Sequence, residues 1–147
     1  MTMASSTTLA RRVRESGLRL TSQRLAVLAA IDEHPDHPDV TAIAASARRR
    51  VGTISTQAVY NVLEALTTAG LIRRIEPAGS PALYETRVGD NHHHLVCRSC
   101  GTTADVACVV GHGPCLEPSS SRGFLVDEAE VTIWGLCRAC RPKPHPR

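Results

Sequence analysis

The sequence predicts an α+β fold, with an N-terminal winged helix-turn-helix domain followed by a small C-terminal α/β domain. Three observations lead to this prediction. The first half contains four segments with helical spacing of apolar residues, two short strand-like runs follow them, and two Cys-x-x-Cys pairs lie in the last third. We place the first domain at residues 1–87, the second at residues 88–141 and a loose tail at residues 142–147.

The first two helices are predicted from signals at their ends. Residues 1–6 are polar, and we expect them to be disordered. A short helix over residues 7–16 is followed by Gly17, which favours its end, and Thr21 is a good N-cap for a second helix over residues 22–33. The apolar residues of these helices that we expect to face the core are Leu9, Val13, Leu25, Leu28 and Ala29.

Helices three and four are predicted in the same way. Residues 34–38 contain two prolines and break the chain before a third helix over residues 39–50. Ser55 then caps a fourth helix over residues 56–69, and Gly70 is suited to its C-terminal end. The inward-facing residues of the fourth helix are Val59, Val62, Leu63 and Leu66.

Two strands complete the first domain. Residues 71–75 and residues 82–86 have strand character, and residues 77–81 between them hold a turn with two prolines and a glycine. Helices closed by such a hairpin form a winged helix, in which the fourth helix is placed for the major groove of DNA.

The second domain is predicted mainly from strand patterns. Residues 88–91 are interpreted as a hinge, and residues 92–97 and 102–108 as two strands. Residues 109–123 are rich in Gly, Pro and Ser and favour an irregular loop, and residues 124–136 contain a long strand.

Composition limits the function. Aromatic residues make up only 3% of the chain, so the core must be built from aliphatic side chains. Residues 1–75 carry ten arginines and six acidic residues, a net charge of +4, while residues 76–147 carry seven basic and eight acidic residues, a net charge of −1. The basic half favours a polyanionic partner.

The chain has no apolar run long enough to cross a membrane, and the first ten residues lack the apolar core of a signal peptide. We therefore expect a cytoplasmic protein whose thiols bind metal.

The four paired cysteines, Cys97, Cys100, Cys137 and Cys140, predict a structural Zn²⁺ site. Each pair can form a knuckle that presents two thiolates to one ion. The alternative is two unrelated buried or redox-active pairs, but a thioredoxin-type pair needs a βαβ context that is not visible here.

A histidine cluster predicts a second metal site. On a strand, His92 and His94 point to one face and His93 to the other. Glu85 on a neighbouring strand adds a carboxylate, and His37 could supply a further ligand from the first domain, although a solvated loop histidine is the alternative for it. Such a site suits an exchangeable metal.

The residues that we expect to face DNA lie mainly on the fourth helix. Gln57 and Asn61 can bind adenine edges, and the Tyr60 ring can pack on thymine methyl groups. The alternative is a solvated helix face. Arginines that could contact phosphates are Arg19, Arg24 and the run Arg48 to Arg50, whose alternative role is to stabilise the end of their own helix.

From Gly17 to Cys140 the chain resembles the ferric uptake regulator (Fur) family. The motifs that carry the resemblance are Arg19-Leu-Thr-Ser-Gln-Arg24, Ser55-Thr-Gln-Ala-Val-Tyr-Asn-Val-Leu63, Tyr84-Glu85, His92-His-His-Leu-Val-Cys-Arg-Ser-Cys-Gly101, Asp105 and Trp134-Gly-Leu-Cys-Arg-Ala-Cys140. The acidic segment Asp127-Glu-Ala-Glu-Val-Thr-Ile-Trp-Gly135 is most similar to the actinobacterial branch that represses catalase-peroxidase genes.

The resemblance implies a dimeric repressor whose second domain is a dimerisation domain and which binds an inverted-repeat DNA operator when a sensor metal is bound. It implies that the four paired cysteines hold structural Zn²⁺, that Tyr60 contacts bases and that Arg19 enters the minor groove. The regulatory ligands that it implies, for Fe²⁺ or Mn²⁺, are His37, Glu85, His92, His94 and Asp105.

The chain departs from the family pattern at two places. A further metal site found in some members is not expected, because its positions carry Asn91, His93 and Ala129. A loop replaces the helix that members usually have between the Cys pairs, and Cys108 and Cys115 are additional thiols that could be redox-active or incidental.

Three functional hypotheses follow. The first is a peroxide-responsive repressor of oxidative-stress genes such as catalase, and the second is an iron or other divalent-metal uptake regulator that ignores peroxide. The third is a zinc-dependent hydrolase, which needs a general base and a substrate pocket. Because the chain has no His-Glu-x-x-His motif, we expect that it is not an enzyme.

Overall fold

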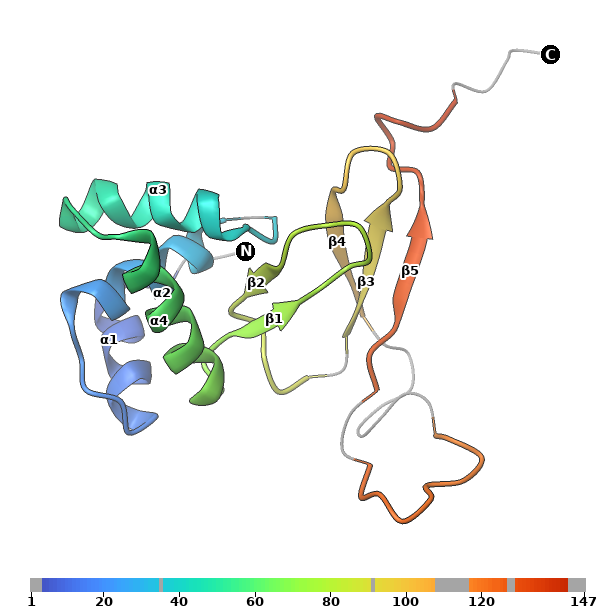
Figure 1. Ribbon diagram of the computed structural model, residues 1–147, viewed down its shortest axis with the longest axis horizontal. Coiled ribbons are helices and arrows are strands. Elements are labelled where there is room, and N and C mark those ends of the chain that lie inside the picture. Colours follow the sequence, from blue (N-terminus) through green and yellow to red (C-terminus); the bar gives the residue numbers. More distant parts are fainter. Residues whose placement is uncertain (1–3, 35, 91, 108–116, 127–128, 143–147) are drawn as a thin grey trace. The chain divides into compact units, whose positions relative to one another are not determined.

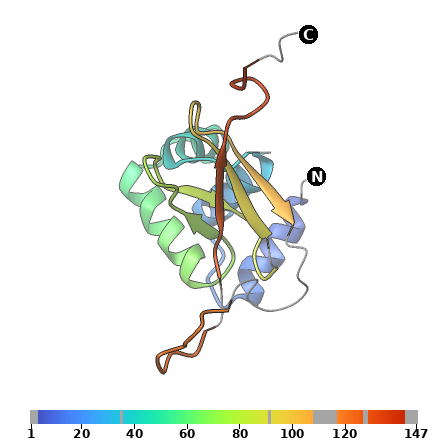
Figure 2. The ribbon, with the colours of Figure 1, turned by 90° about the vertical axis from the view of Figure 1, so that its right-hand side faces the viewer.

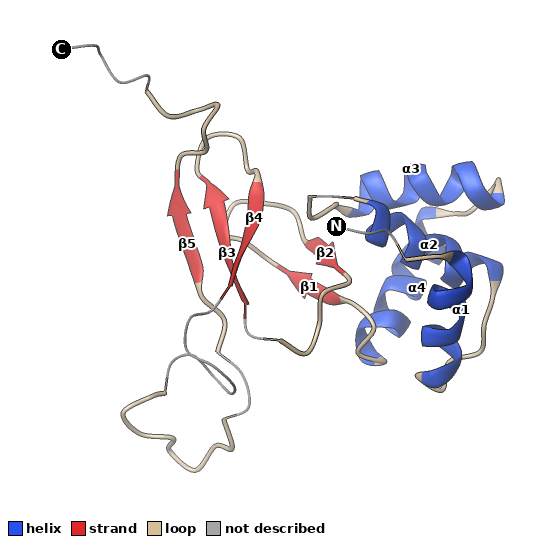
Figure 3. Ribbon diagram, turned by 180° about the vertical axis from the view of Figure 1, so that it is seen from behind, coloured by secondary structure: helices blue, strands red, loops and turns tan. Residues whose placement is uncertain are grey.

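The computed structural model describes residues 4–34, 36–90, 92–107, 117–126 and 129–142. The chain divides into two compact units, Met1–Val88 and Gly89–Arg147. Figures 1 and 3 show that the four described helices all belong to the first unit. No helix among the described residues is long and apolar enough to span a membrane.

Each helix of the first unit begins at a side chain that caps it. Ser5, Thr21, Asp39 and Ser55 each accept a hydrogen bond from the amide three residues further on, which satisfies one of the free N–H groups of the first turn. The helices are α1 Ser6–Glu15, α2 Ser22–Glu33, α3 Val40–Val51 and α4 Thr56–Thr68. The four predicted helices are therefore confirmed to within two residues at each end.

The prediction of disorder over residues 1–6 is wrong at Ser5 and Ser6, because Ser5 caps α1 and Ser6 begins it. The amide of Ala4 also donates a hydrogen bond to the Asp32 carboxylate at 2.8 Å. Polar residues near the start of a chain suggest disorder, but serine is also a preferred N-cap residue, and Ser5 has this role here.

The helical core is aliphatic, as the scarcity of aromatic residues predicts. Leu28, Ile43 and Leu63 lie fully buried at its centre. Six consecutive residues of α2, Ala26 to Ile31, are buried, so this helix is covered on nearly all sides by α1, α3 and α4. Leu25, predicted to face the core, is only half-buried at the edge of the cluster.

Helix α4 ends in a Schellman motif that determines where the following strand can begin. Gly70 has a φ of 72°, and the amides of Gly70 and Leu71 donate to the carbonyls of Thr67 and Leu66. The Leu71 amide is thus used by the helix end, and strand β1 is limited to Arg73–Ile75 rather than residues 71–75.

A two-stranded hairpin follows the helices. Strand β1 pairs antiparallel with β2, Leu83–Glu85, and Arg74 lies opposite Tyr84. The hairpin is joined to the start of α3, since the Tyr84 amide donates to the Pro38 carbonyl at 3.0 Å and Leu83 forms a bridge with Asp39. Four helices closed by this hairpin give the winged-helix arrangement.

The second unit is built on a three-stranded sheet in the order β4-β3-β5 (Figures 1 and 3). Strand β3, His92–Cys97, is central; it pairs antiparallel with β4, Thr103–Ala107, and parallel with β5, Thr132–Gly135. The long strand predicted within residues 124–136 is therefore wrong in extent, and the described residues 117–126 form a loop that hangs away from the sheet (Figure 2).

Candidate metal centres and DNA-facing surface

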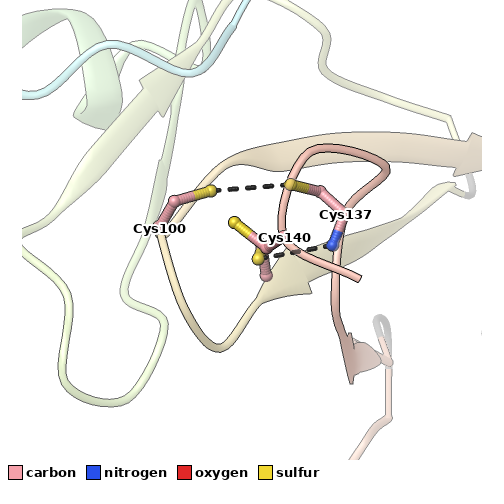
Figure 4. Close-up of side chains that lie close together, drawn as sticks. Cys100, Cys137 and Cys140 are labelled. Carbon is pink, nitrogen blue, oxygen red and sulfur yellow. Dashed lines mark hydrogen bonds between the residues drawn. The ribbon is translucent and has the colours of Figure 1, made fainter. Parts of the chain in front are cut away.

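The parallel pairing of β3 and β5 brings both Cys-x-x-Cys pairs to one end of the sheet. Cys97 lies at the end of β3 opposite Gly135, and the Cys137 amide donates to the Cys97 sulfur at 3.3 Å. The Gly101 amide donates to the Cys97 carbonyl, and the Cys140 amide to the Cys137 carbonyl, both at 3.0 Å. Each pair is thus a tight knuckle, and Figure 4 shows the side chains of the labelled cysteines gathered together.

The geometry of the four sulfurs fits tetrahedral zinc. All four lie within 4.8 Å of one another, and the sulfurs of Cys100 and Cys137 are 3.7 Å apart. Zn–S bonds of about 2.3 Å in a tetrahedron give sulfur–sulfur edges of about 3.8 Å. The described cysteines form no disulfide. The arrangement therefore brings together the four cysteines that the sequence grouped.

The thiolate form is favoured at two of these cysteines. Hydrogen bonds from the backbone of Cys137 and Cys100 lower the pKa of Cys97 to about 6. A hydrogen bond with Thr102 lowers the pKa of Cys100. A hydrogen bond with Ser99 lowers the pKa of Cys140, but hydrogen bonds with Cys137 and Cys100 outweigh it and raise this pKa to about 11. Because metal binding requires deprotonated sulfur, the site favours a cation most at Cys97 and Cys100.

A histidine–carboxylate pair lies within the first unit. His37 follows α2 and its Nε2 lies 3.0 Å from Oε2 of Glu85, at the end of β2. The backbone hydrogen bond from Tyr84 to Pro38 joins the two chain segments next to this pair. His37 is thus engaged with a carboxylate and is not the solvated loop histidine of the alternative interpretation.

A second cluster lies within the second unit. His92 and His94 share a face of β3, with ring centroids 5.0 Å apart. The antiparallel register places Asp105 of β4 directly opposite His94, and its Oδ1 lies 3.5 Å from Nε2 of His94 and 3.9 Å from Nε2 of His92. Two imidazoles and a carboxylate on one face are a donor set for a divalent ion.

Asp90, at the start of the histidine-rich stretch, also contacts this cluster. Its Oδ1 lies 2.8 Å from Nδ1 of His92, the ring nitrogen that faces away from Asp105. Such a contact orients the ring and selects its tautomer, as carboxylate partners of metal-binding histidines do. Asp90 lies two residues before His92 in the sequence, so a contact between its carboxylate and the His92 ring is local.

The positions of the further metal site found in some family members stay as the sequence describes them. His93 projects from the face of β3 opposite to His92 and His94. Asn91, Cys108 and Cys115 lie outside the described residues.

Helix α4 presents the predicted recognition residues to solvent. Gln57, Tyr60 and Asn61 are exposed, while Val59, Val62 and Leu63 on the opposite face are buried in the core. The Gln57 side-chain amide donates to Oδ1 of Asn61 at 2.9 Å, so the two amides form one polar surface. The exposed face has the hydrogen-bonding groups needed to contact base edges.

The arginines predicted to contact phosphates differ in their surroundings. Arg24 donates to the Arg19 carbonyl at 2.6 Å and holds the exposed loop that carries Arg19, beside Asn61 of α4 in one groove. By contrast, Arg48 donates to the Ile54 carbonyl, and Arg50 forms an ion pair with Glu33. Arg48 and Arg50 thus have partners within the first unit, which neither the phosphate interpretation nor the helix-end alternative predicted.

Comparison with known proteins identifies the family of the chain. The family described as the ferric uptake regulator family matches residues 15–132. The chain belongs to the ferric uptake regulator family. The transcriptional regulator FurA of Mycobacterium tuberculosis is 55% identical to this Fur-family chain over 138 residues, which cover 94% of the chain and 93% of FurA.

More distant Fur-family proteins are also similar. The peroxide operon regulator of Bacillus subtilis is 26% identical over 138 residues, covering 90% of this chain and 91% of its own length. Among solved structures, the ferric uptake regulator of Helicobacter pylori superimposes with a TM-score of 0.72 at 18% identity, over 99% of both chains, which confirms the fold.

Membership of the Fur family establishes the general activity. The protein is a metal-dependent transcriptional regulator of the actinobacterial FurA-like branch and not an enzyme, so the hydrolase hypothesis is excluded. Solved structures of similar proteins include the Helicobacter pylori regulator with three functional metal-binding sites, a zinc-bound manganese uptake regulator and the Francisella tularensis regulator with iron.

Proposed function

We propose that the protein is a dimeric repressor that binds an inverted-repeat operator when its sensor metal is bound, and that peroxide relieves this repression. The observation that carries the proposal is the presence of histidine–carboxylate groups in both units, separate from the four-cysteine site. The first unit is the DNA-binding domain, the second the dimerisation domain, and the protein acts in the cytoplasm.

The structural role belongs to the cysteines. Cys97, Cys100, Cys137 and Cys140 would hold Zn²⁺, which joins two segments far apart in the sequence and makes metal binding part of the folding free energy. The site is closed by four protein ligands, so it has no position for a substrate or for exchange during signalling.

The sensor role belongs to the mixed nitrogen and oxygen ligands. We assign His37 and Glu85 from the first unit, together with His92, His94 and Asp105 from the second, to one regulatory site for Fe²⁺ or Mn²⁺. These donor atoms suit both metals. Because the ligands come from two units, occupancy would select one relative orientation of the DNA-binding domains from an existing ensemble.

DNA recognition should depend on α4 and on arginine. Replacing Tyr60 with alanine should cost about 1–3 kcal/mol, mostly in discrimination between operator and unrelated DNA, because the exposed ring packs on bases. Replacing Arg19 with alanine should weaken binding to all sequences and reduce the slope of affinity against salt by about one unit. Fluorescence anisotropy at several salt concentrations measures both effects, with Arg50→Ala as the control because its partner is Glu33. Wild-type binding by both variants would place the recognition surface elsewhere.

Peroxide sensing would follow from the ligand set. A regulatory site without thiolates suits Fe²⁺, which reacts with peroxide, and oxidation of a ligand imidazole at His37 or His92 would weaken metal binding. The alternative route is oxidation of Cys108 and Cys115. The similar protein of Bacillus subtilis is a peroxide operon regulator, which supports the proposal of a peroxide response.

Micromolar-range peroxide should release operator DNA from the iron-loaded protein but not from the manganese-loaded protein, as measured by anisotropy. The Cys108→Ser, Cys115→Ser double variant should behave in the same way. Equal release with both metals would indicate the thiols. If neither form releases DNA, the protein is the plain iron or divalent-metal regulator of the second hypothesis.

A further inference from the structure

Strand β2 connects two functional regions of the first unit. Tyr84 belongs to the apolar core beneath the helices, whereas its neighbours Leu83 and Glu85 do not, as expected for side chains that alternate between the faces of a strand. Glu85 is hydrogen-bonded to His37. One peptide bond therefore separates a proposed metal ligand from a residue of the helical core.

Tyr84 and helix α4 line the same groove. Tyr84 lines one groove together with Tyr60 and Asn61 of α4 and with Arg74, its partner across the hairpin. Tyr84 is 5% exposed and Tyr60 46% exposed, so the groove joins a buried ring to a residue that faces solvent.

Backbone hydrogen bonds tie the strand that carries Tyr84 to the segment that follows His37. Its amide donates to the carbonyl of Pro38, the residue after His37, at 3.0 Å. Asp39, the next residue, forms the bridge to Leu83 and caps α3. A backbone shift of His37 or Glu85 on metal binding would therefore be transmitted to the strand that carries Tyr84.

We propose that Tyr84 is a positioning residue that couples occupancy of the His37–Glu85 pair to the placement of Tyr60 on α4. Metal binding then adjusts base recognition inside each DNA-binding domain, in addition to any effect on the angle between domains. The inference rests on the proposed sensor role of His37 and Glu85, and it adds a second route from metal to DNA.

The first test compares operator affinity with and without Mn²⁺ in zinc-loaded wild type, Tyr84→Phe and Tyr84→Leu. Allosteric couplings are commonly about 5- to 150-fold. Tyr84→Leu should reduce the metal response by about tenfold or more, while Tyr84→Phe should keep it, because the ring fills the space against α4. Val13→Ala, a cavity variant of the same core on α1, controls for lost stability and should keep the full response.

The second test observes the two tyrosines directly. The chain contains only Tyr60 and Tyr84, so labelling with 3-fluorotyrosine gives two ¹⁹F signals that the single Phe variants assign. Added Zn²⁺, beyond the equivalent held by the cysteines, should shift both signals, and His37→Ala should abolish both shifts. In Tyr84→Leu the Tyr60 signal should no longer respond.

The outcomes separate this inference from the proposed function. If Mn²⁺ tightens operator binding in wild type and to the same degree in Tyr84→Leu, the coupling through Tyr84 is refuted and the sensor site stands. A wild-type Tyr60 signal that does not change when a second equivalent of Zn²⁺ is bound, an equivalent that His37→Ala does not bind, also refutes it, without any need for a folded Tyr84 variant. If wild type shows no metal response at all, the sensor role fails and the inference fails with it.

Discussion

The Cys97→Ser variant is expected to lose its zinc and its folded second unit together. Cys97 ends the central strand β3, and its sulfur accepts the hydrogen bond from the Cys137 amide that joins the two knuckles. Structural zinc contributes about 10 kcal/mol or more to folding, which is comparable to the whole stability of a small domain. Loss of one thiolate should therefore abolish the dimer as well, as measured by native mass spectrometry and metal analysis.

The matched control for this variant is the Cys108→Ser, Cys115→Ser double substitution, which removes two thiols outside the Cys-x-x-Cys pairs. It should keep one zinc per chain and remain dimeric. A Cys97→Ser protein that is still dimeric with one zinc per chain would refute the structural role of the site.

The His94→Ala variant is expected to fold, hold zinc and dimerise, but to lose metal-dependent DNA binding. His94 lies opposite Asp105 and beside His92, so its removal opens the cluster without touching the cysteine knuckles. We expect Mn²⁺ to change its operator affinity less than about threefold, which corresponds to ~0.65 kcal/mol. Adding Glu85→Ala should remove any remaining response.

His93→Ala is the matched control, because His93 lies on the same strand and projects from the opposite face. It should respond to Mn²⁺ like the wild type. The assignment of the sensor site would be wrong if the His94→Ala, Glu85→Ala protein still gained operator affinity on adding metal.

The helical half of the fold was predictable because its signals are local. The capping residues and Gly70 act within one turn of the helix that they begin or end, so Ser55 and Gly70 could be assigned without knowledge of the packing. The same local view missed the cap at Ser5, where no long apolar pattern drew attention to the helix start.

The second unit was harder to predict because its order depends on pairing between distant residues. The apolar content around Phe124 and Leu125 suggested a strand, yet these side chains are 77% and 95% exposed and the parallel pairing with β3 begins only at Thr132. Strand propensity mostly reflects packing on a neighbour, which sequence alone does not specify.

The candidate sites show the same division. The pairing of cysteines and the shared face of His92 and His94 follow from spacing in the sequence. Asp105 was identified only by resemblance to the Fur family, because its contact depends on the register of β4 against β3. The contact of Asp90 with His92 and the contact between Arg24 and Arg19 depend on local geometry and could not be foreseen from a list of charged residues.

The most direct test of the account measures how Mn²⁺ changes the affinity of the zinc-loaded protein for an inverted repeat selected from random DNA with the manganese-loaded protein. The sensor assignment predicts that Mn²⁺ tightens binding at least about tenfold, or ~1.4 kcal/mol. It also predicts that His37→Ala in the first unit and His94→Ala in the second each abolish this gain. Equal affinity with and without Mn²⁺, or a full gain in either variant, would contradict a regulatory site built from both units.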